Sequence, residues 1–90
     1  MSIKPPEKAW TEAANALHKV FDFESFGQAL AFMSSAAPLI EAMNHHPEWT
    51  NVYNRVTVRL TTHDAGHKVT DLDRQLARVL DEHYTKYNYK

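Results

Sequence analysis

The sequence predicts an α+β domain in which helices cover one face of a four-stranded antiparallel sheet, in the order ββαββα. Two segments, one early and one in the middle of the chain, alternate apolar and polar residues as half-buried antiparallel strands do. Two other segments, each preceded by a helix-capping pattern, repeat apolar residues at helical spacing. Because strands and a helix follow one another twice, we expect the helices on one face of a single sheet.

Composition limits the class of protein. The 90 residues have the size of one domain, and we expect residues 1–90 to form it. A hydrophobic content of 43% and a net charge of −1 are typical of a globular protein, and they predict neither direct nucleic-acid binding nor a membrane span. The sequence has no cysteine, which excludes disulfides and thiolate metal sites. We therefore expect a cytoplasmic protein, and its small size favours oligomerisation.

The first quarter of the chain reads as an arm and a hairpin. Residues 1–9 include two adjacent prolines, and we expect them to form an extended arm. Residues 10–23 then predict two short strands that meet at a tight turn near Asn15, since asparagine tolerates left-handed backbone. Leu17 and Phe21 fall on the same side of the second strand.

The first helix is predicted over residues 26–44. Ser25 and Gln28 form a capping-box pattern at its start. Pro38 is expected to bend it or to cost one hydrogen bond, and Pro47 requires it to end near residues 44–46. Two apolar rows run along it, which predicts packing against both a sheet and a partner subunit: Phe26, Ala29, Leu30, Met33, Ala37 and Ile40 in one, and Phe32, Ala36 and Leu39 in the other.

The second half repeats this order. Residues 51–62 alternate throughout and are predicted as one long strand, with a turn at residues 64–66 and a short return strand beginning at residues 67–69. Thr70 and Asp73 mark the start of the last helix, whose apolar stripe includes Leu76 and Leu80. Residues 83–90 are expected to fray.

Candidate functional residues gather between Glu41 and Trp49. Glu41 and His45 are four residues apart, so they share a helix face if the helix reaches His45. His45 and His46 then lie on the turn that leaves the helix, where imidazoles suit proton transfer near neutral pH. The alternatives are a histidine pair that complements the helix dipole and a glutamate that is merely solvated.

Three further residues are ambiguous when each is taken alone. His63 follows the predicted long strand and joins the site only if the fold brings it to His45 and His46; otherwise it is a turn residue. Asp73 suits a capping box as well as a ligand site at a helix start. Trp10 is as well explained by core packing, whereas Trp49 offers an aromatic face beside the histidines.

A zinc site of three histidines is the competing interpretation. Adjacent histidines rarely bind one metal together, and the sequence lacks the zinc patterns of hydrolases and deaminases. We therefore expect no metal. His18, His67 and His83 have no companions in sequence, and we expect them to be surface residues.

Taken together, several motifs of the sequence resemble those of a known family. The spacing Glu41-x-x-x-His45-His46-Pro47-Glu48-Trp49, then Asn51-Val52-Tyr53-Asn54-x-Val56, then Leu60-Thr61-Thr62-His63-Asp64, then Thr70-x-x-Asp73, is similar to that of pterin-4a-carbinolamine dehydratases. Trp10 and the Phe21-Asp22-Phe23-Glu24-Ser25-Phe26 stretch resemble the family's entry into its first long helix. The likeness covers residues 10 to about 82, and its histidine spacing is highly specific.

The resemblance implies an enzyme, a hydro-lyase. Such proteins eliminate water from 4a-hydroxytetrahydropterin to give quinonoid dihydropterin, which recycles the pterin of aromatic amino-acid hydroxylases, without a metal or cofactor. It implies a homodimer or homotetramer. Carried over, His45, His46 and His63 are the catalytic histidines, with Glu41 and Asp73 as supporting acids and Trp10 and Trp49 near the pocket. We expect His46 or His63 to protonate the leaving hydroxyl, and Glu41 to set the tautomer of His45 on the N5 side.

Departures and alternatives accompany this interpretation. The family's usual N-terminal helix is predicted to be absent or shortened, because nine residues with two prolines precede Trp10. Compared with the family's spacing, one extra residue lies between His63 and Asp73, which leaves Asp71 as the fallback acid. The alternative function is a protein-binding module that stabilises a transcription-factor dimer. A small assembly chaperone is a third idea, which nothing in the sequence supports.

Overall fold

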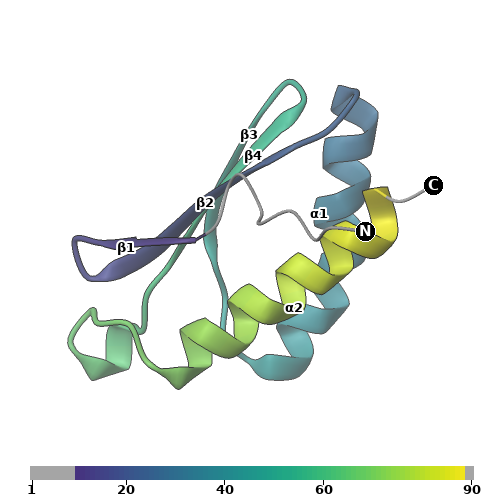
Figure 1. Ribbon diagram of the computed structural model, residues 1–90. Coiled ribbons are helices and arrows are strands. Elements are labelled where there is room, and N and C mark those ends of the chain that lie inside the picture. Colours follow the sequence, from purple (N-terminus) through teal and green to yellow (C-terminus); the bar gives the residue numbers. More distant parts are fainter. Residues whose placement is uncertain (1–9, 89–90) are drawn as a thin grey trace, which may run out of the picture.

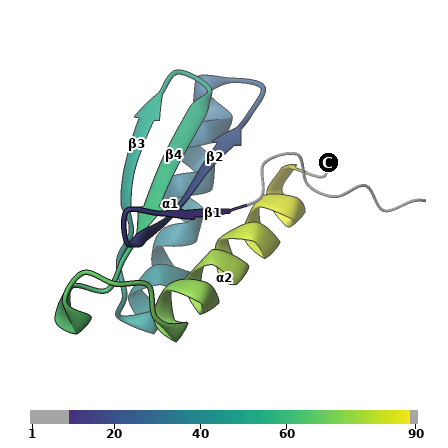
Figure 2. The same cartoon turned by 60° about the vertical axis from the view of Figure 1, so that its left-hand side comes forward.

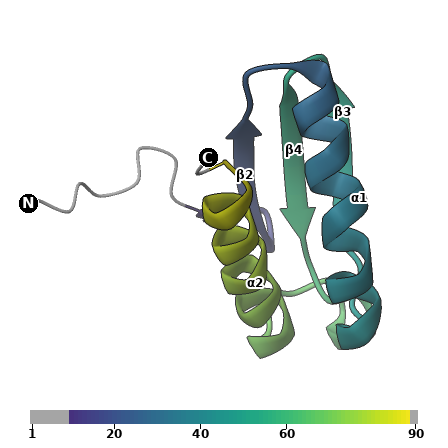
Figure 3. The same ribbon diagram turned by 90° about the vertical axis from the view of Figure 1, so that its right-hand side faces the viewer.

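The computed structural model describes residues 10–88, so the predicted arm, the question of an N-terminal helix, and the last two residues lie outside the described part. Four strands form one antiparallel sheet in the order β1-β2-β4-β3. Both helices lie on the same side of the sheet (Figures 1 and 2). They run side by side across that face (Figure 3). The predicted α+β class, with the order ββαββα, is confirmed.

The first hairpin forms as predicted. Strand β1 spans Thr11–Ala13 and β2 spans Ala16–Asp22. The two residues between them, Ala14 and Asn15, have φ values of 52° and 62°. Two consecutive left-handed residues are the conformation of a tight hairpin turn that matches the twist of the strands.

The second hairpin corrects the prediction of one long strand over residues 51–62. Strand β3 spans Glu48–Val52, β4 spans Arg55–Leu60, and the chain reverses at Tyr53 and Asn54. The Asn51 side chain donates to the backbone oxygens of Tyr53 and Arg55 at 3.1 and 3.0 Å, and these bonds hold the turn. The predicted return strand at residues 67–69 is wrong, since a single bridge joins Thr62 to Lys68 there.

Helix α1 spans Phe26–Met43 and agrees with the predicted range. The Ser25 hydroxyl accepts from the Gln28 backbone N–H at 3.1 Å. Pro38 lies inside the helix on an exposed position, and the helix continues through it to a left-handed cap at Asn44. Both apolar rows contribute to the buried face, which consists of Ala29, Phe32, Ala36 and Ile40.

Helix α2 spans Asp71–Asn88 and is longer than predicted. The expectation that residues 83–90 fray is wrong for 83–88, because tertiary contacts hold this end. The Tyr84 hydroxyl donates to the Asp22 backbone oxygen at 2.7 Å, and its ring packs 4.9 Å from that of Phe21. The ring of His83, expected at the surface, lies 5.4 Å from the ring of Phe32. Long-range packing therefore continues a helix that its polar sequence would not hold.

The core lies between the sheet and the two helices. Its fully buried large side chains include Phe21 and Phe32, whose ring centroids are 5.2 Å apart. Val56, Val58 and Leu60 face the same core from β4. The end of α1, the segment after β4 and the start of α2 gather at one end of this core (Figure 1). No helix among residues 10–88 is long and apolar enough to cross a membrane.

Candidate active site

A hollow of about 390 Å³ opens at the end of the molecule where these three segments meet. Its lining includes His45 and His46 from the turn after α1, and His63 from the short 3-10 helix η1, His63–Ala65. Histidines that are distant in sequence therefore face one space. The volume is in the range of sites that hold one small organic molecule, roughly 300 to 1,000 Å³.

The turn after α1 holds His45 against the start of α2. His45 Nε2 lies 2.6 Å from the Asp73 Oδ1 atom. The Asp73 side chain is fully buried, whereas 11% of the His45 side chain remains exposed. An ionised carboxylate can only accept, so Nε2 of His45 carries a hydrogen and donates it. His45 is thus held in one tautomer, with Nδ1 left as the nitrogen that can exchange a proton.

Asp73 receives three hydrogen bonds. Besides His45, the Thr62 hydroxyl donates to its Oδ2 at 2.7 Å and the Thr70 backbone N–H donates to the same atom at 2.9 Å. Burial alone raises the pKa of the Asp73 carboxyl, but these donors, His45 foremost, outweigh it and hold the pKa below its ordinary value. The buried carboxylate is therefore ionised at neutral pH.

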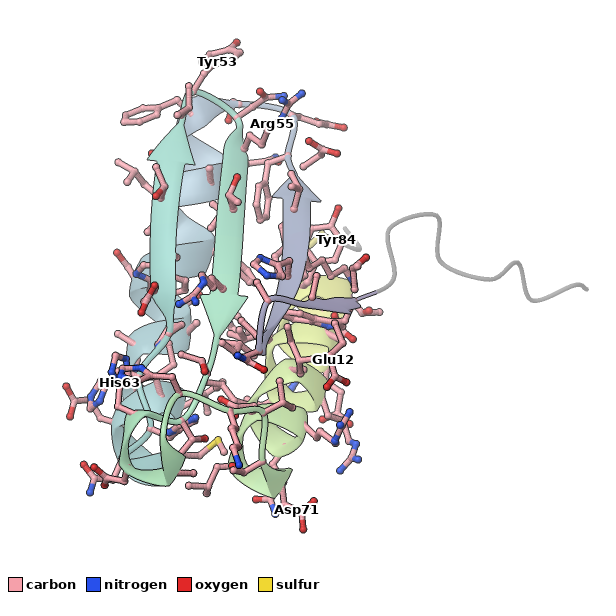
Figure 4. All side chains as sticks on the ribbon, turned by 90° about the vertical axis from the view of Figure 1, so that its left-hand side faces the viewer. Glu12, Tyr53, Arg55, His63, Asp71 and Tyr84 are labelled. Carbon is pink, nitrogen blue, oxygen red and sulfur yellow. The ribbon has the colours of Figure 1, made fainter. Side chains whose placement is uncertain are left out.

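Asp73 also keeps the structural role that its position predicted. Its bond to the Thr70 N–H is the reciprocal half of a capping box, while the Thr70 hydroxyl accepts from the Leu72 N–H at 3.3 Å. One carboxylate thus caps α2 and orients His45. Asp71, the fallback acid, is exposed on the same helix end, and Figure 4 shows it pointing away from the body of the molecule.

The predicted pairing of Glu41 with His45 is wrong. The side chain of Glu41 is 76% exposed, and its Oε1 atom lies 3.9 Å from Nε2 of His46. The reason is the left-handed residue Asn44, which ends α1 and turns the chain before His45. His45 therefore leaves the helix face that carries Glu41, and Asp73 takes the place that Glu41 was expected to fill.

His63 approaches the hollow from the other wall. Its Nε2 atom lies 3.5 Å from the Glu48 Oε2 atom, and the other Glu48 oxygen accepts from Arg59 at 2.9 Å. The side chains of His46 and His63 are 56% and 62% exposed, respectively, so both are open to a ligand from solvent.

The two tryptophans are not part of this lining. Trp10 donates through Nε1 to both carboxylate oxygens of Asp81 at 3.0 Å and lines a separate hollow with Leu17. Glu12 lines that second hollow too, and Figure 4 shows it on the other side of the molecule from His63. Trp49 is half-buried and packs against the core from β3. The resemblance implied that both tryptophans lie near the pocket; in the described chain, neither lines the hollow, and Trp49 directly follows the lining residue Glu48.

Two residues of the site were not singled out from the sequence as members. Thr62 and Glu48 hold Asp73 and His63, respectively, and both line the hollow. Their positions inside the Pro47-Glu48-Trp49 and Thr61-Thr62-His63 motifs were the available signal. Among residues 10–88, no three histidine, aspartate or glutamate side chains converge as a group that could hold a metal ion.

Comparisons with known proteins point to one family. The model of a family described as "Pterin 4 alpha carbinolamine dehydratase" matches residues 2–83. A protein of Opitutus terrae is 59% identical over 75 residues, which are 83% of this chain and 77% of that protein. A protein of Solibacter usitatus is 56% identical over 73 residues, which are 81% of this chain and 76% of that protein. Both carry the name "Putative pterin-4-alpha-carbinolamine dehydratase".

Two solved structures share the fold. A Brucella melitensis protein described as a "transcriptional coactivator/pterin dehydratase" is 40% identical, with a TM-score of 0.78 over 83% of this chain and 81% of its own. A pterin dehydratase-like protein described as a RuBisCO assembly factor of the alpha-carboxysome is 23% identical, with a TM-score of 0.68 over 86% of this chain and 88% of its own. The second likeness concerns the fold alone.

Proposed function

The chain belongs to the pterin 4 alpha carbinolamine dehydratase family, and on this premise we propose that it eliminates water from a 4a-hydroxytetrahydropterin by histidine acid–base catalysis. One observation carries the proposal: His45, His46 and His63 line one open hollow, and His45 is held there by a buried carboxylate. A bicyclic pterin is a small ligand of the size that such a hollow accepts.

The reaction needs two proton transfers on neighbouring ring atoms. The bond from C4a to oxygen breaks as the hydroxyl receives a proton, and a C4a=N5 double bond forms as N5 loses one. Water and quinonoid dihydropterin are the products, so atoms and charge balance. Imidazoles in opposite protonation states provide an acid and a base together near neutral pH.

The geometry favours particular roles. His45 has its Nε2–H engaged by Asp73, so its other nitrogen is a defined base on the N5 side. The ion pair with Asp73 stabilises His45 once it takes that proton. His46 and His63 are the exposed imidazoles, and we assign the proton for the leaving hydroxyl to one of them.

The experiment is to measure dehydration of freshly generated 4a-hydroxytetrahydropterin by its change in absorbance. We expect His45→Ala, His46→Ala and His63→Ala each to lower kcat, by about 10²-fold or more for the acid and the base. His18→Ala is the matched control, because His18 lies on β2 and bonds to the Ala13 backbone oxygen, outside the hollow. Wild-type rates in all three site variants would refute the proposal.

Location and assembly belong to the same proposal. We place the enzyme in the cytoplasm, as a homodimer or homotetramer. Apolar side chains left exposed on α1 support self-association, since 47% of Phe26 and 42% of Leu30 lie open, with Ala37 exposed on the same helix face. Analytical ultracentrifugation would measure the assembly, and a Phe26→Glu, Leu30→Glu double variant is expected to lower its mass, to that of one chain if the wild type is a dimer.

A protein-binding role is the second candidate, and the same exposed stripe of α1 favours it. The Brucella melitensis relative is described as a coactivator as well as a dehydratase, which supports asking whether this chain also binds a protein dimer. The two functions separate experimentally. His45→Ala is expected to abolish dehydration and to leave a helix-mediated partner bound, whereas the Phe26→Glu, Leu30→Glu variant is expected to release it.

A further inference from the structure

We propose that His67 is a positioning residue that holds the imidazole of His63 in its working orientation. The catalytic consequence rests on the proposed function, whereas the placement of the ring is a property of the fold. The sequence predicted His67 to be an ordinary surface histidine. It is exposed, but its ring packs on that of a residue that lines the hollow.

The contact is an edge-to-face packing of two imidazoles. The ring centroids of His63 and His67 lie 4.7 Å apart, with 68° between the ring planes. His67 does not line the hollow itself, so it supports His63 from outside the space that a substrate would occupy. Among residues 10–88, this is the aromatic contact that His63 makes.

His63 depends on such support because little else holds it. Its side chain is 62% exposed, and an exposed side chain changes rotamer within nanoseconds. Other titratable or charged side chains belong to the same region. Glu48 approaches from β3 with Arg59 of β4 bound behind it, Asp64 is the next residue along η1, and His46 lines the same hollow. Edge-to-face rings restrict orientation in a way that a single 3.5 Å ion pair does not.

The backbone that carries His67 is held in a left-handed conformation. Gly66 and His67 follow one another with φ values of 82° and 61°, both left-handed. The Gly66 N–H donates to the His63 oxygen and the His67 N–H donates to the Thr62 oxygen, each at 3.0 Å. Histidine is one of the few side chains enriched in this conformation. Hydrogen bonds thus hold a residue with a ring where glycine would be the relaxed choice.

The segment is also tied to the other half of the site. Thr62, whose backbone oxygen receives the His67 N–H, donates its hydroxyl to Asp73, the partner of His45. A change at residue 67 can therefore disturb both His63 and the bond between Asp73 and His45. The variants must separate the loss of ring packing from a distortion of the loop.

Three variants make that separation. His67→Asn keeps a residue that tolerates left-handed backbone but removes the ring, and His67→Ala removes the ring outright. His67→Phe keeps the ring and removes the titratable nitrogens; an aromatic residue at such an angle already occurs in this chain, since Tyr53 has a φ of 52°. We expect kcat to fall about 5- to 10-fold in the Ala and Asn variants with KM nearly unchanged, and to stay within about twofold of wild type in the Phe variant.

A second measurement does not depend on activity. In ¹H–¹³C NMR spectra, the ring signals of His63 can be assigned because they disappear in His63→Ala. We expect these signals to shift in His67→Ala and His67→Asn, which lack the neighbouring ring. In His67→Phe a ring current is expected to keep them displaced. Unchanged His63 signals in both ring-less variants would overturn the placement, and a Phe variant as slow as the Ala variant would overturn positioning by packing. If the wild-type protein shows no dehydration, the proposed function fails while the spectra still decide the contact.

Discussion

Replacing Asp73 by asparagine is the sharpest test of how the site is held together. The side chain is fully buried and serves donors on both oxygens: His45 Nε2 at 2.6 Å on Oδ1, and Thr62 and the Thr70 N–H at 2.7 and 2.9 Å on Oδ2. An amide of the same shape has only one oxygen. If the amide oxygen faces Thr62 and Thr70, its NH₂ group meets Nε2 of His45, which must then switch tautomer to accept. If the oxygen faces His45 instead, the NH₂ group meets the Thr70 N–H, a buried donor that then has no acceptor.

The expected cost follows from that count. If the amide oxygen faces His45, the Thr70 N–H is left facing an NH₂ group, and the bond to His45 loses its charge assistance. A buried donor without a partner costs about 1 to 3 kcal/mol, and a charge-assisted bond is roughly twice as strong as a neutral one. We expect the free energy of unfolding to fall by about 2 to 4 kcal/mol. Dehydration should slow by about 10² to 10³-fold, or roughly 3 to 4 kcal/mol, because His45 loses its fixed tautomer.

The measurement combines urea unfolding with initial-rate kinetics of pterin dehydration under conditions where the variant is folded. Asp71→Asn is the matched control, since it makes the same chemical change two residues earlier on an exposed position of α2. It should stay within about 0.5 kcal/mol and about twofold of wild type. A folded Asp73→Asn protein with wild-type kcat would refute the reasoning, and so would an Asp71→Asn protein that loses as much.

Three smaller predictions follow from the same contacts. Glu41→Gln should change kcat by less than about threefold, because this exposed carboxylate lies 3.9 Å from His46 and does not pair with His45; a loss like that of Asp73→Asn in the same assay would restore the pairing expected from the sequence. Thr62→Val should lower the free energy of unfolding in urea by about 1 to 3 kcal/mol, because the Asp73 oxygen loses a buried donor. The exposed control Thr57→Val should lower it by less than about 0.5 kcal/mol, and equal losses in the two variants would contradict this prediction. Burial, aided by the nearby Lys86 charge, lowers the pKa of His83. As the pH falls, the unfolded chain therefore takes up this proton before the folded chain does, and the free energy of unfolding of the wild type should fall below about pH 6.5. His83→Gln should show a shallower fall between about pH 7 and 5, and parallel plots of unfolding free energy against pH for the two proteins would exclude the effect.

Much of the fold was readable because its signals are local. The capping pair of Ser25 and Gln28, the left-handed turn at Asn15 and the alternation along β2 each depend on residues a few positions apart. Such patterns predicted the order of strands and helices, and with it the α+β class. The spaced histidine motifs were equally local in character and pointed to the family that the comparisons support.

Errors arose where distant residues compete with local preference. Alternation continued smoothly through Tyr53 and Asn54. The chain turns there because the Asn51 side chain binds the reversing backbone and the Asn54 side chain donates to the backbone oxygen of distant Phe23. The polar end of α2 stays helical because Tyr84 packs on the strand that carries Phe21. In both cases contacts absent from the local pattern outweigh it.

The sequence alone was enough to name the three histidines, because their identity and their spacing along the chain can be read without the fold. The sequence did not show which acid binds His45. Glu41 lies four residues from His45 in the chain, whereas Asp73 lies 28 residues away, yet its Oδ1 atom is 2.6 Å from Nε2 of His45. Turning the chain at Asn44 and packing α2 beside α1 settled that partnership. The physical reason is that a buried carboxylate is stable only when hydrogen-bond donors surround it, and the donors to Asp73 come from segments that only folding brings together.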